Sequence, residues 1–237
     1  MKLSIVIPAF NEASNIIKTI KETLRTVSSF QEDFEVIVVD DGSTDATAKV
    51  ARSVNDKRLR VVKKRNGGKG SALKYGFKFV KGDFVTFIDA DLDLHPRQIK
   101  CFLEVQQVTS ADIVVGNKRH PESKIVYPWH RRFLSQCFYY FQKMLFGLPV
   151  KDTQAGLKLF RKEVLERVFA KSLVKRYAAD LEFLVNANQL GYKIADAPVE
   201  ICFQRFNSRI KLSDIYYMFM DMLGIFYRLR IKHYYDT

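Results

Sequence analysis

The sequence of 237 residues lacks the features of several protein classes. Its three cysteines, Cys101, Cys137 and Cys202, are widely spaced and form no CxxC pair, which argues against a disulfide framework and against a zinc site. No apolar run reaches the ~20 residues that a membrane-spanning helix needs, and Pro8 interrupts the first apolar run too early for a signal peptide. We therefore expect a soluble or peripheral protein in a reducing, cytoplasmic setting.

Positive charge is concentrated in one part of the chain. The net charge is +13, but residues 116–176 alone contain 14 basic and 4 acidic residues. Such a local excess indicates an anionic partner, namely phosphate, nucleic acid or anionic lipid, with a solvated basic face as the alternative. No RNP-like, helix-turn-helix or zinc-finger motif is present to support nucleic-acid binding, so we expect no nucleic-acid partner.

The first half of the sequence alternates between strands and helices. The apolar runs of strand length are 3–9, 34–39, 59–63, 84–88 and 113–115. Continuous apolar strands separated by helices are typical of a parallel sheet with helices on both faces. In the second half, the pattern predicts helices over 131–146, 162–169, 180–190 and 213–230. It also predicts a strand over 194–201 that Pro198 confines to a sheet edge or bulge.

Acidic side chains follow two of the predicted strands. Asp40 and Asp41 end the second strand, and Asp89 and Asp91 follow the fourth. Ligands of open parallel sheets bind beyond the carboxyl ends of the strands, so these carboxylates are expected in one crevice. Paired carboxylates suit Mg²⁺ or Mn²⁺ together with substrate phosphates, although a solvated loop with helix-capping acids stays open. A carboxylate at a strand end can also accept hydrogen bonds from a nucleoside.

Several motifs, taken in order along the chain, resemble those of a known enzyme family. They are Pro8-Ala9-Phe10-Asn11-Glu12, the Asp40-Asp41-Gly42-Ser43 stretch, the glycine-rich turn Asn66-Gly67-Gly68-Lys69-Gly70, and Asp89-Ala90-Asp91. Each motif alone is weak, but the set resembles family 2 glycosyltransferases of the GT-A fold. The resemblance implies an α/β fold with a mostly parallel, Rossmann-like sheet flanked by helices.

The second half of the chain resembles one subgroup, the polyprenyl-phosphate hexosyltransferases, which include the dolichyl-phosphate glucose and mannose synthases. The motifs are Gly116-Asn117-Lys118, the stretches 131–135, 152–160 and 179–182, and the stretch 205–209. The Asp-Thr-Gln-x-Gly-x-Lys stretch most resembles the glucose type. The chain departs from the family at Lys118, where arginine is usual, and at Phe206, where glycine is usual.

The resemblance implies a role for each matched position. Residues implied to bind the nucleotide sugar are Pro8, Phe10, Glu12, Asp40, Asp41, Lys69, Asp89, Ala90 and Asp91. The acceptor phosphate would be held by Lys118, Arg131, Ser135 and Arg205. A divalent cation, Mg²⁺ or Mn²⁺, would be bound by Asp89 and Asp91, with Asp93 as a third ligand. The residues implied to act in catalysis are Asp89, Asp91, Arg131 and Arg205.

The resemblance also implies an activity: transfer of a hexose, with UDP-glucose as the leading donor, to a polyprenyl or dolichyl phosphate with inversion. A phosphate acceptor is already anionic and needs no strong general base. The alternatives are GDP-mannose as donor, and a saccharide acceptor activated by Asp152 or Asp180. We expect a catalytic domain over 1–210, in which 1–115 binds donor and metal and 116–210 binds the acceptor.

Two aromatic-rich helices predict contact with a membrane surface. The segments 133–146 and 215–227 are apolar almost all round and have basic residues nearby. They are too short to span a bilayer but suit the headgroup region, while core packing or a dimer interface is the alternative. We therefore expect peripheral attachment to the cytoplasmic face of a membrane through a C-terminal segment, 211–237. A homo-oligomer stays open.

Overall fold

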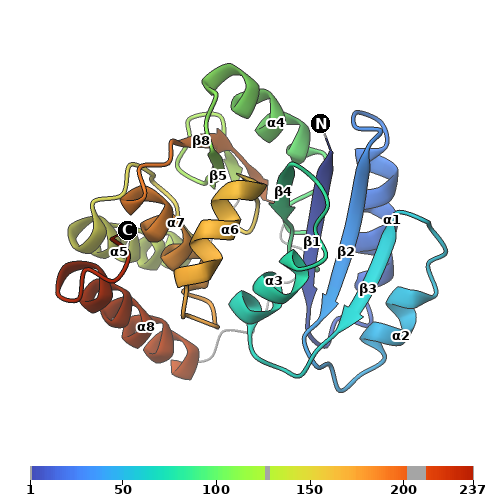
Figure 1. The fold of residues 1–237 in the computed structure, drawn as a ribbon, viewed down its shortest axis with the longest axis horizontal. Coiled ribbons are helices and arrows are strands. Elements are labelled where there is room, and N and C mark those ends of the chain that lie inside the picture. The colour runs from blue at the N-terminus through green and yellow to red at the C-terminus, as the bar shows by residue number, and fades with distance from the viewer. Residues whose placement is uncertain (1, 126–128, 202–211, 237) are drawn as a thin grey trace.

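The computed structural model describes residues 2–125, 129–201 and 212–236. The side chains at positions 129–135, 137, 212, 213 and 215 lie outside this description. Figure 1 shows one twisted sheet with helices on both sides, and a pair of long helices at the end opposite the N-terminal strands.

A seven-stranded sheet forms the centre of the molecule, in the order β3-β2-β1-β4-β7-β5-β8. The strands are β1 (Leu3–Ala9), β2 (Phe34–Asp40), β3 (Leu59–Lys63), β4 (Phe84–Phe87), β5 (Ile113–Asn117), β7 (Lys158–Arg161) and β8 (Ile194–Pro198). All neighbours are parallel except β7, which runs antiparallel to both β4 and β5. A separate pair, β6 (Lys124–Ile125) and β9 (Glu200–Ile201), is also parallel.

Both faces of the sheet are buried because the strands are apolar on both sides. In β1, Val6 packs into one core, whereas Ile5 and Ile7 pack into the other. Helices α1 (Ile16–Val27), α2 (Thr47–Arg52) and α4 (Gln98–Thr109) cover the Ile5 face. The Val6 face is covered by α3 (Lys69–Phe77), α6 (Lys162–Lys171) and α7 (Ala179–Gln189). This two-sided burial is the arrangement that continuous apolar strands predict.

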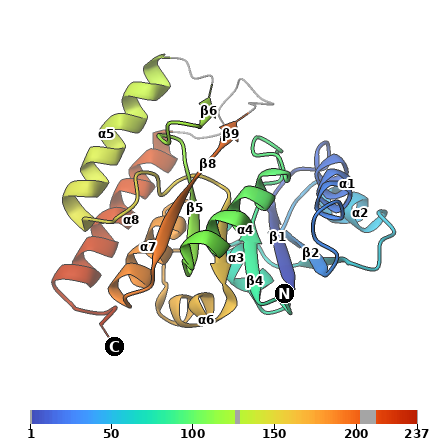
Figure 2. The same ribbon diagram turned by 90° about the horizontal axis from the view of Figure 1, so that it is seen from above.

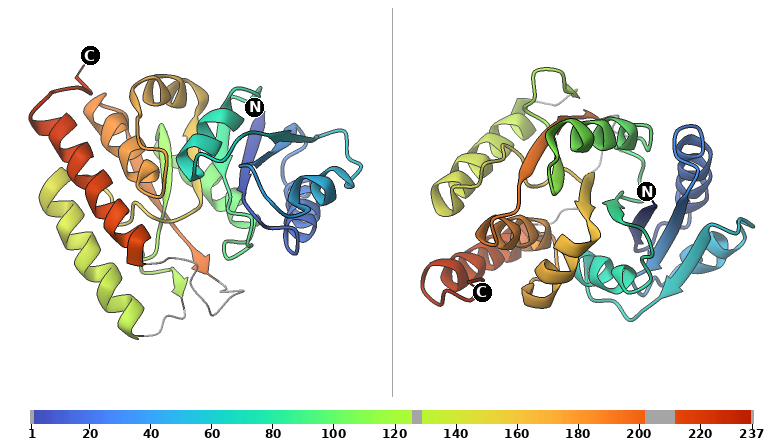
Figure 3. Two further views of the ribbon diagram at one scale, coloured as in Figure 1. Left: turned by 90° about the horizontal axis from the view of Figure 1, so that it is seen from below. Right: turned by 45° about the horizontal axis from the view of Figure 1, so that its top comes forward.

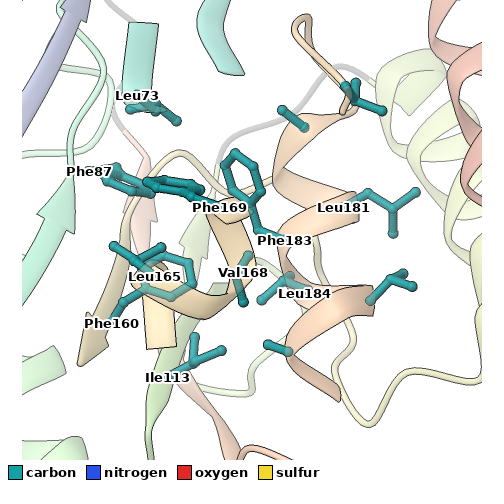
Figure 4. Packing of buried hydrophobic residues seen from close by; sticks show 14 of the residues in the cluster. Leu73, Phe87, Ile113, Phe160, Leu165, Val168, Phe169, Leu181, Phe183 and Leu184 are labelled. Atoms are coloured by element: carbon teal, nitrogen blue, oxygen red, sulfur yellow. The ribbon is translucent and has the colours of Figure 1, made fainter. Parts of the chain in front are cut away.

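Aromatic rings fill the Val6 side of the core. The rings of Phe169 and Phe183 meet edge to face with centroids 4.9 Å apart, and Phe87 lies 5.3 Å from Phe160. Figure 4 shows these rings between the sheet and helices α6 and α7. Close aromatic packing of this kind holds α7 against the sheet, and the N-terminus of α7 reaches the functional site described below.

Helices α5 (Trp129–Phe146) and α8 (Leu212–Arg230) lie side by side at one end of the molecule, as Figures 2 and 3 show. Phe141 of α5 stacks on Phe219 of α8 with centroids 5.6 Å apart. One stripe of α8, formed by Met222, Ile225 and Leu229, is buried in the core. Phe146 of α5 is buried in the same core, and Phe138, Phe141 and Leu145 pack against it. Core packing, the alternative for both helices, is therefore true of one side of each helix. Among the described helices, none is both long and apolar enough to cross a bilayer.

Candidate active site

A cavity of about 680 Å³ opens where the carboxyl ends of β1, β2 and β4 meet the N-termini of α3 and α7. Nine of the residues expected to bind donor, metal or acceptor line it: Pro8, Phe10, Glu12, Asp41, Lys69, Asp89, Ala90, Asp91 and Lys118. Asp40 is fully buried, and neither Asp40 nor Asp93 is among the lining residues. The Arg131 and Ser135 side chains and all of Arg205 lie outside the described residues.

The loop that follows β1 forms one wall of the cavity and is tied to the loop that follows β2. The Asn11 amide donates to Ser43 Oγ at 3.0 Å, and the Glu12 amide donates to Thr47 Oγ1 at 2.8 Å. The Phe10 ring is 45% exposed at the cavity. An exposed, well-anchored aromatic ring beside polar groups is suited to stack on a nucleoside base.

Asp41 organises the glycine-rich turn at the N-terminus of α3. Its carboxylate accepts hydrogen bonds from the amides of Gly67 and Gly68 and from Lys64 Nζ, at 2.6–3.2 Å. Gly68 has a φ of +89°, and a Cβ there would lie 2.7 Å from Lys175 O. Any other residue would therefore strain the backbone and clash with the carbonyl of Lys175. The contact of Asp41 with a nucleoside stays a prediction. Asp40 Oδ1 accepts from the Ser43 amide, which is a structural role.

Asp89 and Asp91 project from the loop after β4, which Thr19 of α1 anchors by donating from its hydroxyl to Ala90 O at 2.6 Å. Asp89 Oδ1 lies 2.8 Å from Lys69 Nζ. Burial, followed by repulsion from the carboxylates of Asp89 and Asp93, raises the pKa of Asp91 to about 6. Carboxylates that repel each other in a partly buried loop form an arrangement that a bound cation stabilises.

Gly156 packs directly against the carboxylate of Asp89 in the loop after β4. A Cβ on Gly156 would lie only 2.1 Å from Asp89 Oδ2. The close approach arises because the antiparallel strand β7 pairs with β4 and brings the preceding Gln154–Leu157 segment beside the loop after β4. The sequence pattern predicted neither β7 nor this contact, although the stretch that contains Gly156 was among the matched motifs.

We expect Gly156→Ala to lower transfer activity about a hundredfold, since the methyl group displaces Asp89 and small misplacements at a reacting centre have effects of this order. Initial rates on folded protein, with circular dichroism as the check of folding, measure the effect. Gly224→Ala in α8 is the matched control, because its added Cβ has only the far end of the Arg228 side chain nearby, at 3.3 Å. Full activity in Gly156→Ala would contradict the tight contact.

A chain of alternating charges runs from Asp89, in the loop after β4, into the core. Lys69 Nζ lies 2.8 Å from Asp89 and 3.5 Å from Asp180, and Asp180 also pairs with Lys158 Nζ at 3.0 Å. Lys158 is fully buried, and its ammonium also donates to Ala155 O. Burial opposes the charge on Lys69, but Asp180 and Asp89 outweigh it and raise the pKa of Lys69. Burial acts to raise the pKa of Asp180, and Lys158 and Lys69 outweigh it and lower that pKa.

Lys118 lines the cavity and is paired with a buried acid. Its Nζ lies 3.6 Å from Asp152 Oδ2, and its amide donates to the same oxygen at 3.3 Å. The other oxygen, Asp152 Oδ1, accepts from the Gln154 amide. Asp152 and Asp180, the two candidates for the single base that a saccharide acceptor would need, are thus both paired with lysines.

Some lining residues had no site role assigned from the sequence, although several of them belong to the matched motifs. These are Asn66, Gly68, Ala72, Gln154, Arg176, Tyr177, Asp214 and Met218, with Ala9 beside the predicted Pro8 and Phe10. Arg176 and Tyr177 come from the loop before α7, and Met218 comes from α8. The sequence signal available for Arg176 was its place in the basic block directly before the matched stretch 179–182.

The mostly parallel sheet, with acidic strand ends around one cavity, has the GT-A fold. The chain belongs to glycosyl transferase family 2, whose family model matches residues 4–169. It is 31% identical to the dolichyl-phosphate beta-glucosyltransferase ALG5A of Trichomonas vaginalis, over 96% of this chain and 74% of that protein. It is also 31% identical to the dolichyl-phosphate beta-glucosyltransferase of Dictyostelium discoideum, over 83% of this chain and 65% of that protein.

Solved structures share the fold. Glucosyl-3-phosphoglycerate synthase from Mycobacterium tuberculosis, in complex with Mn²⁺, UDP and phosphoglyceric acid, superposes with a TM-score of 0.69 and 22% identity, over 95% of this chain and 77% of that one. Mannosyl-3-phosphoglycerate synthase from Rubrobacter xylanophilus gives a TM-score of 0.68 at 21% identity, over 97% of this chain and 74% of that one. At such identities the likeness concerns the fold alone.

Proposed function

We propose that the protein transfers a hexose from a nucleoside diphosphate sugar to the phosphate of a polyprenyl or dolichyl phosphate, with UDP-glucose as the leading donor. The observation that supports this acceptor is the pairing of Asp152 and Asp180 with lysines, because a hydroxyl acceptor needs a free base and a phosphate does not. The similarity to two dolichyl-phosphate beta-glucosyltransferases supports the same acceptor and the glucosyl donor.

A divalent cation fits the acidic end of the cavity. Asp89 and Asp91 offer hard oxygen ligands, and the missing side chain at Gly156 lets the Asp89 carboxylate keep its position in the loop. Within the described ranges, no group of three or more acidic, histidine or cysteine side chains is arranged to hold an ion. We therefore propose that Asp89 and Asp91 share the cation with phosphate oxygens and water, while Asp93 as a third ligand stays a prediction. The bound ion would neutralise charge on the departing nucleoside diphosphate.

The chain's own residues would orient the two substrates. Phe10 and Glu12 frame the nucleoside. The ammonium of Lys69 lies beside Asp89, where the diphosphate would lie. An acceptor phosphate oxygen then attacks the anomeric carbon as the bond to the diphosphate oxygen breaks on the opposite side. We infer inversion from this single displacement, so an α-linked donor gives a β-linked product.

Incubation with a panel of radiolabelled nucleotide sugars and polyprenyl phosphate, with and without a chelator, tests the proposal. We expect a chloroform-soluble, β-linked glucosyl product from UDP-glucose, and loss of that product when the chelator is present. Labelling from GDP-mannose alone would assign the mannose donor instead. Transfer to soluble sugars without lipid would favour a saccharide acceptor and contradict the proposal.

We further propose that α5 and α8 rest on a membrane surface. The two helices expose a set of large apolar side chains, called here the two-helix face: Tyr140, Met144, Tyr216, Tyr217, Phe219, Met220, Leu223 and Tyr227. In α8 the spacing of Tyr216, Met220, Leu223 and Tyr227 forms one stripe opposite the buried stripe. Basic side chains at Lys143 and Arg230 flank this face, as expected for contact with anionic headgroups. We propose the cytoplasmic side, because widely spaced cysteines suit a reducing compartment.

The double variant Met144→Glu/Met220→Glu should lose at least about tenfold in binding to vesicles that contain phosphatidylserine. Each change removes an apolar side chain whose burial in the membrane would be worth roughly 1.5–3 kcal/mol. A difference of about 1.4 kcal/mol is tenfold in affinity. Flotation measures the bound fraction. Val108→Glu is the matched control, because Val108 is 86% exposed on α4 and outside the two-helix face. Equal flotation of the double variant and wild type would reject this membrane contact.

A further inference from the structure

The loop between α6 and α7 brings a cation to the cavity that no motif assigned. This loop comprises residues 172–178, and its Arg176 and Tyr177 line the cavity. It lies between the glycine-rich turn at the start of α3 and the long helix α8. The Ser71 amide donates to Lys175 O at 3.1 Å on the first side, and the Arg176 side chain contacts α8 on the other.

Buried hydrogen bonds hold the loop in one conformation. Glu182 of α7 is fully buried, and its Oε2 accepts from the amides of Leu173 at 2.8 Å and Val174 at 2.7 Å. Its Oε1 accepts from Arg228 at 2.8 Å and from the Tyr235 hydroxyl at 2.6 Å. Hydrogen bonds to a buried carboxylate are among the stronger ones in proteins. The backbone of the loop that presents Arg176 is therefore fixed by buried hydrogen bonds.

The Arg176 guanidinium is held by stacking and keeps its hydrogen-bond donors available. Its Cζ lies 4.3 Å from the centre of the Tyr217 ring. Among the described residues it forms no ion pair within 4.0 Å. Burial raises the pKa of Asp221, an effect that the charge of Arg176 opposes, and Asp214 is a further acid on the cavity wall. A guanidinium that stacks on an aromatic face still presents its N–H groups in the plane, where they can bind a phosphate through two hydrogen bonds.

The position of Arg176 favours the acceptor phosphate over the diphosphate of the donor. The diphosphate end already has Lys69 beside the carboxylates of the metal loop. Tyr217, which holds Arg176, is on α8 and belongs to the two-helix face, and Met218 of the same helix lines the cavity. A lipid phosphate that arrives along this face meets Arg176 where apolar surface gives way to the polar cavity.

We propose that Arg176 binds the phosphate of the lipid acceptor and that Tyr217 positions its guanidinium for that contact. This inference rests on the proposed function. Arg176→Gln should raise the KM for polyprenyl phosphate about ten- to hundredfold, the effect of losing a charge-assisted phosphate contact. The KM for UDP-glucose, and the Kd for UDP measured by titration calorimetry, should change less than twofold. Tyr217→Ala should raise the acceptor KM in the same sense, whereas Tyr217→Phe, which retains the ring, should not.

The matched control is Lys175→Gln, which removes an exposed cation one residue away and should leave both KM values unchanged. An unchanged acceptor KM in Arg176→Gln, with wild-type protein active, overturns the inference. A raised donor KM with an unchanged acceptor KM assigns Arg176 to the diphosphate and also overturns it. Wild-type protein that transfers to no polyprenyl phosphate rejects the proposed function itself, and this inference with it.

Discussion

Asp91→Asn should lower hexose transfer by about 10²–10³-fold, the size of effect seen when one preorganised electrostatic contact to a developing charge is removed. Asp91 lines the cavity beside Asp89, and the two carboxylates are the proposed protein ligands of the cation. Asparagine has nearly the same shape but no charge, so the fold should persist. Initial rates at saturating Mn²⁺, together with Mn²⁺ affinity measured by electron paramagnetic resonance, separate lost metal binding from lost structure.

Asp93→Asn tests whether a third carboxylate of the same loop binds the cation. Asp93 follows two residues later but is not among the lining residues, and its amide donates to Asp91 Oδ1 at 3.1 Å. If Asp89 and Asp91 alone bind the cation, Asp93→Asn should retain Mn²⁺ affinity within a few-fold. A loss equal to that in Asp91→Asn would make Asp93 a third ligand. Full transfer activity in Asp91→Asn would reject the metal site.

Local pattern was enough to predict most elements of the sheet. The strands at 3–9 and 59–63 have the predicted bounds, and β8 ends at Pro198 on the sheet edge, as a proline without an amide hydrogen requires. Helix α4 was not predicted, although its buried residues Ile99, Phe102, Leu103 and Gln106 have helical spacing. The helical spacing of these residues was enough to predict α4 from the sequence.

Strand β7 could not be predicted from pattern because its first residue is a lysine. Lys158 lies in the sheet interior with none of its surface exposed. A buried lysine is tolerated only with a partner, and that partner, Asp180, comes from α7, more than twenty residues away in the sequence. Local propensity contains no information about such a pair, so the antiparallel insertion between β4 and β5 appears only in the folded chain.

The same limit applies to the candidate site. The motifs predicted that Asp41, Asp89 and Asp91 would share a cavity with Lys118, and the structure brings these four side chains to one. The contact of Gly156 with Asp89 depends on strand pairing rather than on the motifs. The contact between Arg176 and Tyr217 depends on where α8 docks, which single-sequence pattern does not give.

Asp180→Asn should destabilise the fold more than any other variant considered. The substitution removes the negative charge that compensates the buried Lys158 ammonium, whose other partner, Ala155 O, is neutral. Removing one member of a buried ion pair costs about 3–5 kcal/mol. For a chain of this length we expect a decrease in Tm of roughly 6–20 °C. Differential scanning calorimetry of the wild-type and variant proteins measures the change.

The double variant Lys158→Met/Asp180→Leu tests the cause of that loss. Replacing both members of a buried ion pair with apolar side chains is often close to neutral, so most of the Tm should return. Lys69 keeps its pairing with Asp89 in this variant. If the stable double variant still transfers glucose to lipid phosphate, then Asp180 supports the structure and abstracts no proton, as expected for an acceptor that arrives ionised. Equal stability of Asp180→Asn and wild type would contradict the buried charge network.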